Sequence, residues 1–241
     1  MSFIKLFPLL ILRRLPKLNF RTILASPLFS QLGEKGTGTS LQPLIIFIIG
    51  VPGVGKGTHS EFIKAAFPGL THLSFGGLIR YQDKIPGSWV SSFPRRETTD
   101  RPLLPARDAV KLVRDTIETG VKQYGQMVWL IDGFPRDEQH VAEWMAQMPR
   151  PDCALYLFCS PEVSCERLLG RAGTSGRPED KDPKSIQERV QRNNAESGPM
   201  LDALEQSGVP IIRVDTDRDL NIVKEEVVDH IRGMMKRSKR V

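Results

Sequence analysis

The sequence predicts an α/β protein built on a doubly wound, five-stranded parallel sheet. Three features predict it: short apolar segments, helix-periodic segments between them, and a glycine-rich loop directly after the first apolar segment. In sheets of this class ligands bind at the carboxyl ends of the strands. The expected strands are Leu44–Ile49, Thr71–Phe75, Val128–Ile131, Ala154–Cys159 and Pro210–Val214.

The individual elements follow from local patterns. Leu44–Ile49 is continuously apolar and is followed by Gly50, which is typical of a strand buried on both faces. Ala106–Thr119 repeats apolar residues at i, i+3, i+4 and i+7, and Asn221–Met235 does the same, so we expect amphipathic helices there. Further helices are expected to begin near Gly55 and near Pro183. No internal repeat is present.

Composition sets the broad class. The 241 residues are 40% hydrophobic and 26% charged, which is typical of one ordinary globular domain. The apolar runs at 9–12 and 44–51 are too short for a transmembrane helix. The three cysteines form no CxxC pair, so neither a disulfide framework nor a structural zinc site is expected. Most of the net charge of +6 lies before Leu44, so no nucleic-acid partner is expected.

The amino-terminal segment has the composition of a targeting sequence. The first 33 residues hold five Lys or Arg, several Ser and Thr, and no acid, as mitochondrial transit peptides do. We therefore expect a leader over 1–43, with a flexible linker at 33–40, and a mitochondrial location. A disordered leader without a targeting role, in a cytoplasmic protein, is the alternative. A basic tail, 236–241, is expected to follow the domain at 44–235.

The segment Gly50-Val51-Pro52-Gly53-Val54-Gly55-Lys56-Gly57-Thr58 carries the chemistry. Its glycines let successive backbone N–H groups turn inward around an anion, and the following helix presents its positive dipole end to the same place. Lys56 supplies a mobile charge for the β- and γ-phosphates of a nucleotide. Asp132 ends an apolar strand, as the acid of a Walker B element does, and is expected to order the water ligands of Mg²⁺. We expect Lys56 to be exposed and to take no part in core packing.

This loop resembles the phosphate loop of the adenylate kinase family, which includes the UMP-CMP kinases and usually ends it in Gly-Lys-Gly-Thr. Three further segments resemble the same family in the same order, and the resemblance covers about Leu44 to Met235. They are Leu73–Arg80, Ile131–Arg136, and the run from Cys165 through Arg177 to Glu188-Arg189.

The resemblance implies a P-loop NTPase fold with an inserted monophosphate-binding arm at about 76–105 and a short lid at about 172–183. It implies a monomeric nucleoside monophosphate kinase that uses ATP and Mg²⁺ and forms ADP and a nucleoside diphosphate reversibly. The residues expected to bind ATP are Gly53, Val54, Gly55, Lys56, Gly57, Thr58, Arg167 and Arg171. Those expected to bind the monophosphate are Phe75, Arg80, Leu104, Gly133, Phe134, Pro135, Arg136, Gln139, His140, Arg177 and Arg189. The catalytic set is Lys56, Arg136, Arg171, Arg177 and Arg189, with Asp132 reaching the metal through water.

Three positions depart from the family pattern. Gly77 stands where an Asp usually caps the arm's first helix, and such a cap is worth about 1 kcal/mol. Phe75 replaces a Thr or Ala, and His140 replaces the base-reading Gln or Asn, with Gln139 one place earlier as a substitute. Phe75 can pack against a base face. Because a purine stacks over more area, we expect weak base discrimination with AMP mildly favoured.

Other functions stay open on the sequence alone. The first is a UMP-CMP kinase, the second a degenerate relative that binds nucleotide without transferring phosphate, and the third a P-loop kinase for another small acceptor. A GTPase switch is disfavoured, since the chain has no Asn-Lys-x-Asp motif.

Overall fold

The computed structural model describes residues 42–96, 101–171 and 182–238. All of them lie in the second of the chain's two units, Leu41–Val241. The leader, the linker, most of the expected lid with Arg177, and the last three residues of the tail lie outside the described residues. Within the described ranges no helix is both long enough and apolar enough to cross a membrane.

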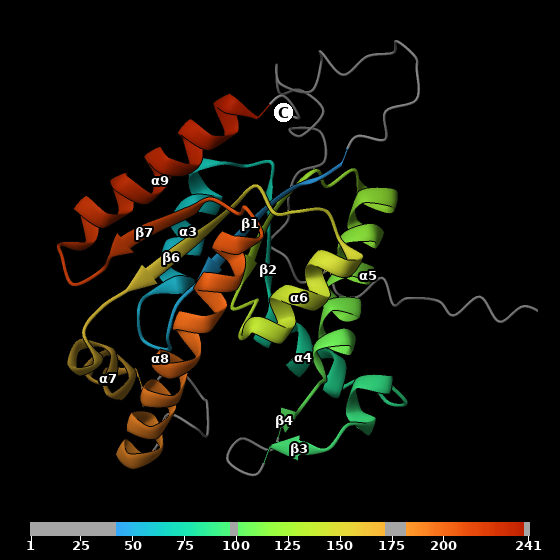
Figure 1. Cartoon of the computed structure of the whole chain (residues 1–241), viewed down its shortest axis with the longest axis horizontal. Coiled ribbons are helices and arrows are strands. Elements are labelled where there is room, and N and C mark those ends of the chain that lie inside the picture. Colours follow the sequence, from blue (N-terminus) through green and yellow to red (C-terminus); the bar gives the residue numbers. More distant parts are fainter. Residues whose placement is uncertain (1–41, 97–100, 172–181, 239–241) are drawn as a thin grey trace, which may run out of the picture. The chain divides into compact units, whose positions relative to one another are not determined.

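The expected parallel sheet is present, with strand order β2-β5-β1-β6-β7 (Figure 1). The central strand, β1, pairs in parallel with β5 on one side and with β6 on the other. Its Ile46 lies opposite Leu130 of β5 and Cys153 of β6. Each predicted strand is found within two residues of its expected ends. The strands are β1 (Leu44–Ile49), β2 (Leu70–Ser74), β5 (Val128–Asp132), β6 (Cys153–Phe158) and β7 (Ile211–Asp215).

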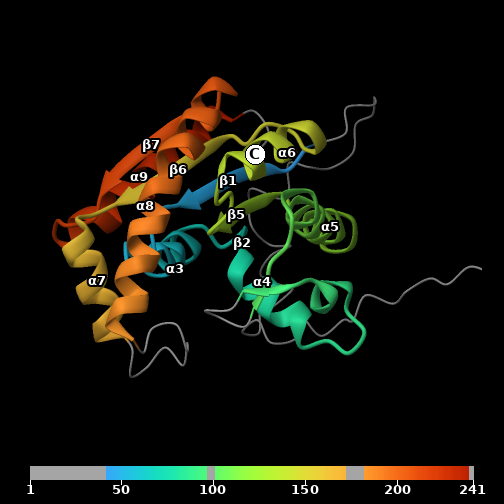
Figure 2. The same cartoon turned by 60° about the horizontal axis from the view of Figure 1, so that its bottom comes forward.

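Helices cover both faces of the sheet, as a doubly wound fold requires (Figures 1 and 2). Leu44, Ile46 and Ile48 of β1 pack on one side with α3 and α9, and the alternate residues of β1 pack on the other with α5, α6 and α8. This alternation explains why β1 is apolar throughout. The bounds are α3 (Lys56–Ala66), α5 (Ala106–Tyr124), α6 (Glu138–Gln147), α8 (Pro183–Gln206) and α9 (Leu220–Arg237).

Two segments flank the carboxyl ends of the strands. One is α4 (Phe75–Asp83), followed by the 3₁₀ turn η1 (Trp89–Ser92) and a small antiparallel pair, β3 (Arg95–Arg96) and β4 (Arg101–Pro102). The other is α7 (Pro161–Gly170), which packs against the start of α8 through Leu168 and Ile186. Figure 2 shows α4 on one side of the strand ends and α7 with α8 on the other.

The start of α4 corrects two expectations. Phe75 was expected to end a strand, but it is the first residue of α4, because Ser74 caps that helix. The Ser74 hydroxyl accepts a hydrogen bond from the Gly77 N–H at 3.3 Å. The missing Asp at position 77 therefore does not leave the helix uncapped, since the serine three residues earlier supplies the acceptor.

The helix expected at Ala106–Thr119 continues to Tyr124. Gly125 ends it in the left-handed conformation, with φ at 63°, and its N–H is bonded to the last turn. A glycine in this position is a common helix terminator, because it has no Cβ to oppose a positive φ. At the other end of the domain, α9 continues to Arg237, two residues into the expected tail.

Candidate functional site

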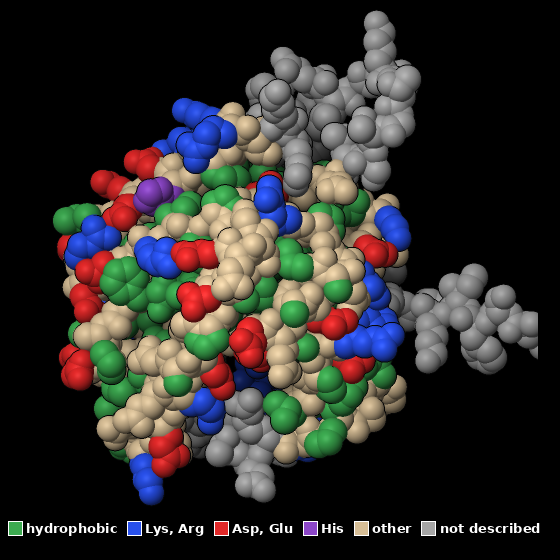
Figure 3. All heavy atoms as spheres, in the orientation of Figure 1, with side chains coloured by type: hydrophobic (Ala, Val, Ile, Leu, Met, Phe, Trp, Pro, Cys, Tyr) green, Lys and Arg blue, Asp and Glu red, His purple; other side chains and the backbone are tan. Residues whose placement is uncertain are grey.

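A cavity of about 780 Å³ lies at the carboxyl ends of the central strands. The loop after β1, the start of α4, the β4 hairpin, the β5–α6 loop and one side of α8 all line it. Figure 3 shows its mouth in the lower middle of the face, where Lys and Arg side chains lie recessed behind acidic ones. The fold therefore brings the phosphate loop and the arm to one space.

Backbone geometry shows why the loop after β1 needs glycine. Gly50 and Gly53 have φ values of 141° and 95°, which other residues rarely adopt. A Cβ at Gly50 would also overlap the Leu157 carbonyl oxygen, and one at Gly53 would overlap that of Ser164. The loop is thus pressed against β6 and α7, which fixes its N–H groups around the start of α3.

Lys56 is half-buried rather than exposed, so the expectation from the sequence was wrong. Its ammonium group donates to the carbonyl oxygens of Gly50 at 2.6 Å and Val51 at 2.9 Å. The pKa of Lys56 is lowered to about 8, mainly by burial. Asp132 opposes this shift, and the positive charges of Arg189, Arg171 and Arg136 add to it. An anion entering the cavity would favour the charged ammonium.

Arginines dominate the electrostatics of the cavity. Of those expected from the sequence, Arg80, Arg136, Arg167, Arg171 and Arg189 all line it. Sequence reasoning missed three more, which are Arg101, Arg192 and Arg218. The only sequence signal for one of them was spacing, because Arg192 follows Arg189 by one turn of α8.

Asp132 lies at the carboxyl end of β5, as expected, and lines the cavity with its side chain 15% exposed. The other acids that line it in the described part of the chain are Asp137 and Glu196. No three His, Cys, Asp or Glu side chains gather as a metal cage among the described residues. One carboxylate beside a phosphate loop nevertheless fits Mg²⁺, which keeps several waters and takes its other ligands from nucleotide phosphates. His72 was missed by the sequence reasoning; its Nε2 lies 3.8 Å from the Asp132 carboxylate.

At the end of the cavity near β7, Arg167 is held in place by the chain itself. Its guanidinium donates to the Thr216 carbonyl oxygen at 2.7 Å and lies 3.3 Å from the Thr216 hydroxyl. His59, one residue after Thr58, is also buried there, and burial together with Arg167 lowers its pKa. Thr216 and His59 were not predicted. The expected residues Gly53, Val54, Gly55, Gly57 and Thr58 line the same region.

At the opposite end, Phe75 belongs to the core. Its side chain is 1% exposed, and its ring meets Phe134 edge-on at 5.2 Å. The Arg136 guanidinium lies over the Phe75 ring, 4.7 Å from its centroid. Phe75 nevertheless lines the cavity, as expected, so its contact with a base stays a prediction. Phe134 is fully buried and is absent from the described residues that line the cavity.

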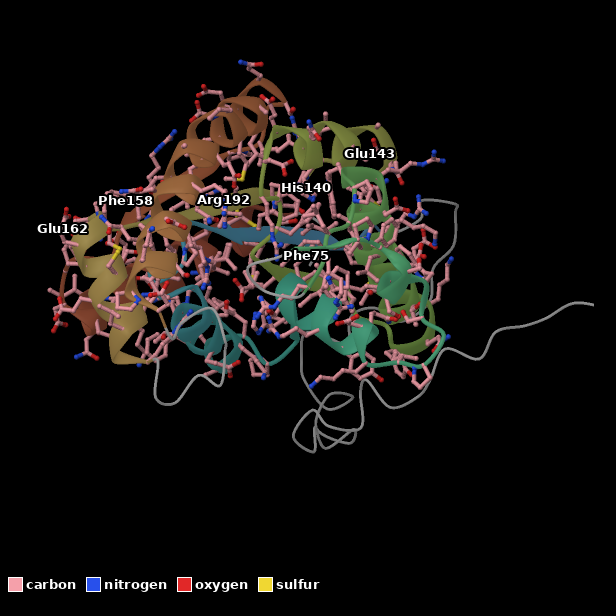
Figure 4. The ribbon with its side chains drawn as sticks, turned by 90° about the horizontal axis from the view of Figure 1, so that it is seen from below. Phe75, His140, Glu143, Phe158, Glu162 and Arg192 are labelled. Atoms are coloured by element: carbon pink, nitrogen blue, oxygen red, sulfur yellow. The ribbon has the colours of Figure 1, made fainter. Side chains whose placement is uncertain are left out.

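His140, not Gln139, lines this end of the cavity. Gln139 is exposed and is absent from the described lining residues, so the suggested substitution was wrong. One position along an α-helix turns a side chain by about 100°, and that rotation separates the two residues. In Figure 4, Phe75 and His140 lie near each other towards the middle, with Arg192 of α8 across from them. Leu104, Gly133 and Pro135 complete the expected residues found here.

Comparison with known proteins agrees with this architecture. A protein-family model described as "AAA domain" matches residues 49–187, from the phosphate loop to the start of α8. The UMP-CMP kinase of Homo sapiens is 31% identical over 192 residues, covering 78% of this chain and 96% of that protein. The chain belongs to the adenylate kinase and UMP-CMP kinase family. The UMP-CMP kinase of Xenopus tropicalis is similar too, at 32% identity over 193 residues, covering 78% of this chain and 97% of that protein.

The protein is therefore a nucleoside monophosphate kinase, a phosphotransferase. Phosphoryl transfer needs the two nucleotides aligned and positive charge around the moving group, with little covalent work from the protein. The kinase meets both needs in one cavity, where a phosphate loop and an arm face each other and nine cationic side chains from the described residues line the wall.

Proposed function

We propose that the kinase transfers the γ-phosphoryl group of ATP, with Mg²⁺, to a pyrimidine nucleoside monophosphate, CMP or UMP. The observation that carries the acceptor assignment is the filled wall at the arm end of the cavity. Phe75 stands where the resemblance expects Thr or Ala, and Arg136 and Phe134 pack around its ring. A bulky, immobile wall leaves less room for a two-ring base than a small side chain would. The similar UMP-CMP kinases support the same acceptor.

The donor nucleotide is assigned to the phosphate loop. The loop's N–H groups and Lys56 would hold its phosphates. Arg167, in α7, and Arg171, directly after it, would contact the same nucleotide. Asp132 would orient the waters of Mg²⁺, which supplies positive charge to the phosphates when it is bound. None of these roles asks a side chain to form a covalent bond.

The acceptor is assigned to the arm end. Arg80 and Arg136 would grip its phosphate through planar, bidentate hydrogen bonds, which guanidinium groups make better than ammonium groups. Arg189, from α8, would neutralise the moving phosphoryl group, and Arg177 would join it from the lid. Leu104, Gly133, Pro135 and His140 would surround the sugar and base.

The sequence favoured AMP because a purine was expected to stack on Phe75. In the structure Phe75 lines the cavity, but its side chain is 1% exposed and lies under the Arg136 guanidinium, which leaves little of the ring for stacking. AMP remains the competing acceptor in the test below.

Two further proposals concern the whole chain. The leader over 1–43, whose first 33 residues hold no acid, directs the kinase to mitochondria, a cytoplasmic location being the alternative. The kinase acts as a monomer, as the resemblance implies.

The deciding experiment measures kcat/KM for CMP, UMP, AMP, GMP and dAMP in an assay that couples ADP formation to a visible signal, at saturating Mg-ATP. We expect CMP or UMP to exceed AMP by about tenfold or more, the discrimination that one misfitting group usually gives. A higher value for AMP would overturn the pyrimidine assignment. No ADP formation with any acceptor would favour the alternative of a nucleotide-binding relative without transfer activity.

A further inference from the structure

His59 brings a buried polar side chain to the end of the cavity near β7. It lies in α3 directly after the phosphate loop, outside the four segments that carry the family resemblance, and it lines the cavity although it is only 2% exposed. Its Nδ1 is among the buried polar atoms that have no hydrogen-bond partner in the described part of the chain. An unsatisfied buried polar group costs free energy, so its presence beside a ligand site calls for an explanation.

Packing restricts the orientation of the His59 ring. It meets the Phe62 ring edge-on at 5.8 Å, and the Lys224 ammonium group of α9 lies 5.1 Å from the centre of that Phe62 ring. A Cβ placed on Gly55 would lie 3.4 Å from Cδ2 of His59 and 3.6 Å from Nε2. The edge of the ring that carries Nε2 therefore lies at the phosphate loop, and the ring stands between that loop and the α9 side of α3.

The protonation state of His59 follows from these surroundings. Burial lowers its pKa from the ordinary value of 6.5, and the positive charge of Arg167 lowers it further, so the ring is neutral at physiological pH. In a neutral ring one nitrogen carries the proton and the other a lone pair. A proton on Nδ1 would be a buried donor without an acceptor, which folded proteins tolerate less than an unused lone pair. Nε2 is therefore an N–H donor beside the loop.

A nucleoside triphosphate bound at the phosphate loop would bring its sugar to this ring. The phosphates take the loop and the positive end of α3, while Leu220 and Val223 line the cavity at the start of α9, where apolar side chains suit a flat base. The sugar joins phosphates to base, and His59 lies between the same two elements. A ribose hydroxyl oxygen accepts a hydrogen bond from a neutral N–H donor.

We propose that His59 reads the sugar of the phosphoryl donor, its Nε2–H donating to a hydroxyl oxygen of the ribose, so that the kinase prefers ATP to analogues that lack this hydroxyl. The inference rests on the proposed function, because it takes the donor to bind at the phosphate loop. His59 is in this role a specificity-determining residue that touches the donor away from the phosphoryl group that moves.

The experiment measures kcat/KM for ATP, 2′-deoxy-ATP and 3′-deoxy-ATP with Mg²⁺ and one saturating acceptor. For the wild-type kinase we expect ATP to exceed one of the two analogues by about tenfold, because loss of the hydroxyl leaves a buried N–H without a partner. The disfavoured analogue identifies the hydroxyl that His59 contacts. Equal values for the three donors overturn the proposal.

Two variants of His59 separate reading from packing. His59→Leu fills much of the same space without a hydrogen-bonding group and should make the three donors equivalent. His59→Gln carries an amide near the position of Nε2 and should restore the preference for ATP. A preference that survives in His59→Leu comes from another group and overturns the role of His59.

Ser60→Ala is the matched control on the same helix. The Ser60 hydroxyl is also buried without a hydrogen-bond partner, but Ser60 is absent from the described residues that line the cavity. The variant should therefore leave the preference for ATP unchanged. A loss of preference in Ser60→Ala equal to that in His59→Leu would show that any change in α3 has this effect, and would overturn the proposal.

The stability of the protein gives an independent readout. Because Nδ1 has no partner, replacing the ring with an apolar side chain removes an unsatisfied group, and without nucleotide His59→Leu should unfold at the same temperature as the wild type or higher. At one fixed concentration of ATP its unfolding temperature should rise less than that of the wild type, since stabilisation by a ligand follows affinity. A less stable His59→Leu with an unchanged preference for ATP indicates a purely structural residue and overturns the proposal.

Direct binding distinguishes failure of this inference from failure of the proposed function. Calorimetric titration with ATP and the two deoxy analogues, without acceptor, measures affinity whether or not a phosphoryl group is transferred. If the acceptor is a purine monophosphate, or if no transfer occurs, the proposed function fails, and a preference for ATP that His59→Leu abolishes still supports the sugar-reading role. Equal affinities of the wild type for the three nucleotides overturn that role alone.

Discussion

Lys56 illustrates how one side chain is governed by its surroundings. The sequence predicts that this lysine is exposed to solvent. In the structure its ammonium group instead donates hydrogen bonds to the carbonyl oxygens of Gly50 and Val51, and several arginines lie close enough to affect its pKa. Burial disfavours its charged form, and bound phosphates would reverse the balance. The residue therefore couples nucleotide binding to proton uptake.

At pH 8, ATP binding to the wild-type kinase should take up about half a proton, because the pKa of Lys56 is about 8 before binding and rises with the phosphates. At pH 6.5 the lysine is already charged and adds no uptake. Calorimetry in buffers of different ionisation enthalpy measures this directly. Lys56→Met should lose both the uptake and phosphoryl transfer while keeping its circular dichroism spectrum. Lys122→Met, at an exposed lysine paired with Glu118, should keep both. Equal uptake in wild type and Lys56→Met would contradict the assignment.

Arg189 is near enough to Lys56 for its charge to lower the pKa of the lysine. Arg189→Ala should lower kcat by about a hundredfold or more, as loss of a charge-stabilising group typically does, while the Kd for ATP changes much less. Arg192→Ala, one turn further along α8, is the matched control and should lower kcat less. Stopped assays at saturating substrates provide the comparison. A loss confined to KM would mean that Arg189 binds substrate equally in the ground and transition states.

At the scale of elements, close approach between helices and strands sets the geometry. Gly120 lets α5 lie directly against Trp129 of β5, since a Cβ at position 120 would overlap the indole ring. The indole N–H in turn donates to the Gln126 carbonyl oxygen at 2.9 Å. This contact helps to fix α5 beside the strand that ends in Asp132.

Gly120→Ala should therefore destabilise the kinase by about 1–3 kcal/mol, the usual cost of overpacking a core. Gly233→Ala is the matched control, because a Cβ placed there in α9 meets only the flexible end of the Arg237 side chain, at 3.5 Å. It should stabilise by up to about 1 kcal/mol through helix propensity. The measurement is the free energy of unfolding of both variants in urea. Similar values for the two would show that α5 can shift away from Trp129 at little cost.

At the scale of the molecule, two apolar layers hold a cavity whose wall is strongly cationic. The buried faces of β1 anchor helices on both sides of the sheet, while α4 and α8 place arginines from distant parts of the chain around one space. The core is therefore nonpolar. The cationic side chains of the site lie at the carboxyl ends of the strands. The leader carries a second concentration of positive charge.

The leader should direct an attached protein to mitochondria. Residues 1–40 fused to a fluorescent reporter are expected to give a mitochondrial signal in eukaryotic cells, because the segment is basic and poor in acids. Replacing Arg13 and Arg14 with Glu in the fusion should abolish the signal by removing the positive charge. A diffuse cytosolic signal from the unchanged leader would reject the targeting role.

The sequence by itself determined the features that depend on neighbours along the chain. The run of apolar residues at Leu44–Ile49 predicted the central strand, and the glycines that follow predicted the phosphate loop. The arginines expected within the described residues were found together because each sits at a fixed offset from a strand end or helix start, and those ends meet on one side of the sheet.

Only the tertiary structure decided which side chains are buried and what pairs with them. It placed Phe75 in the core under Arg136, drew Lys56 back onto its loop, and set His140 beside Asp137 at the cavity. It also brought in Arg101 and Arg218, which belong to no sequence motif. Burial and electrostatic pairing depend on residues far apart in the chain, whereas local patterns encode only which face of an element is apolar and where it begins and ends.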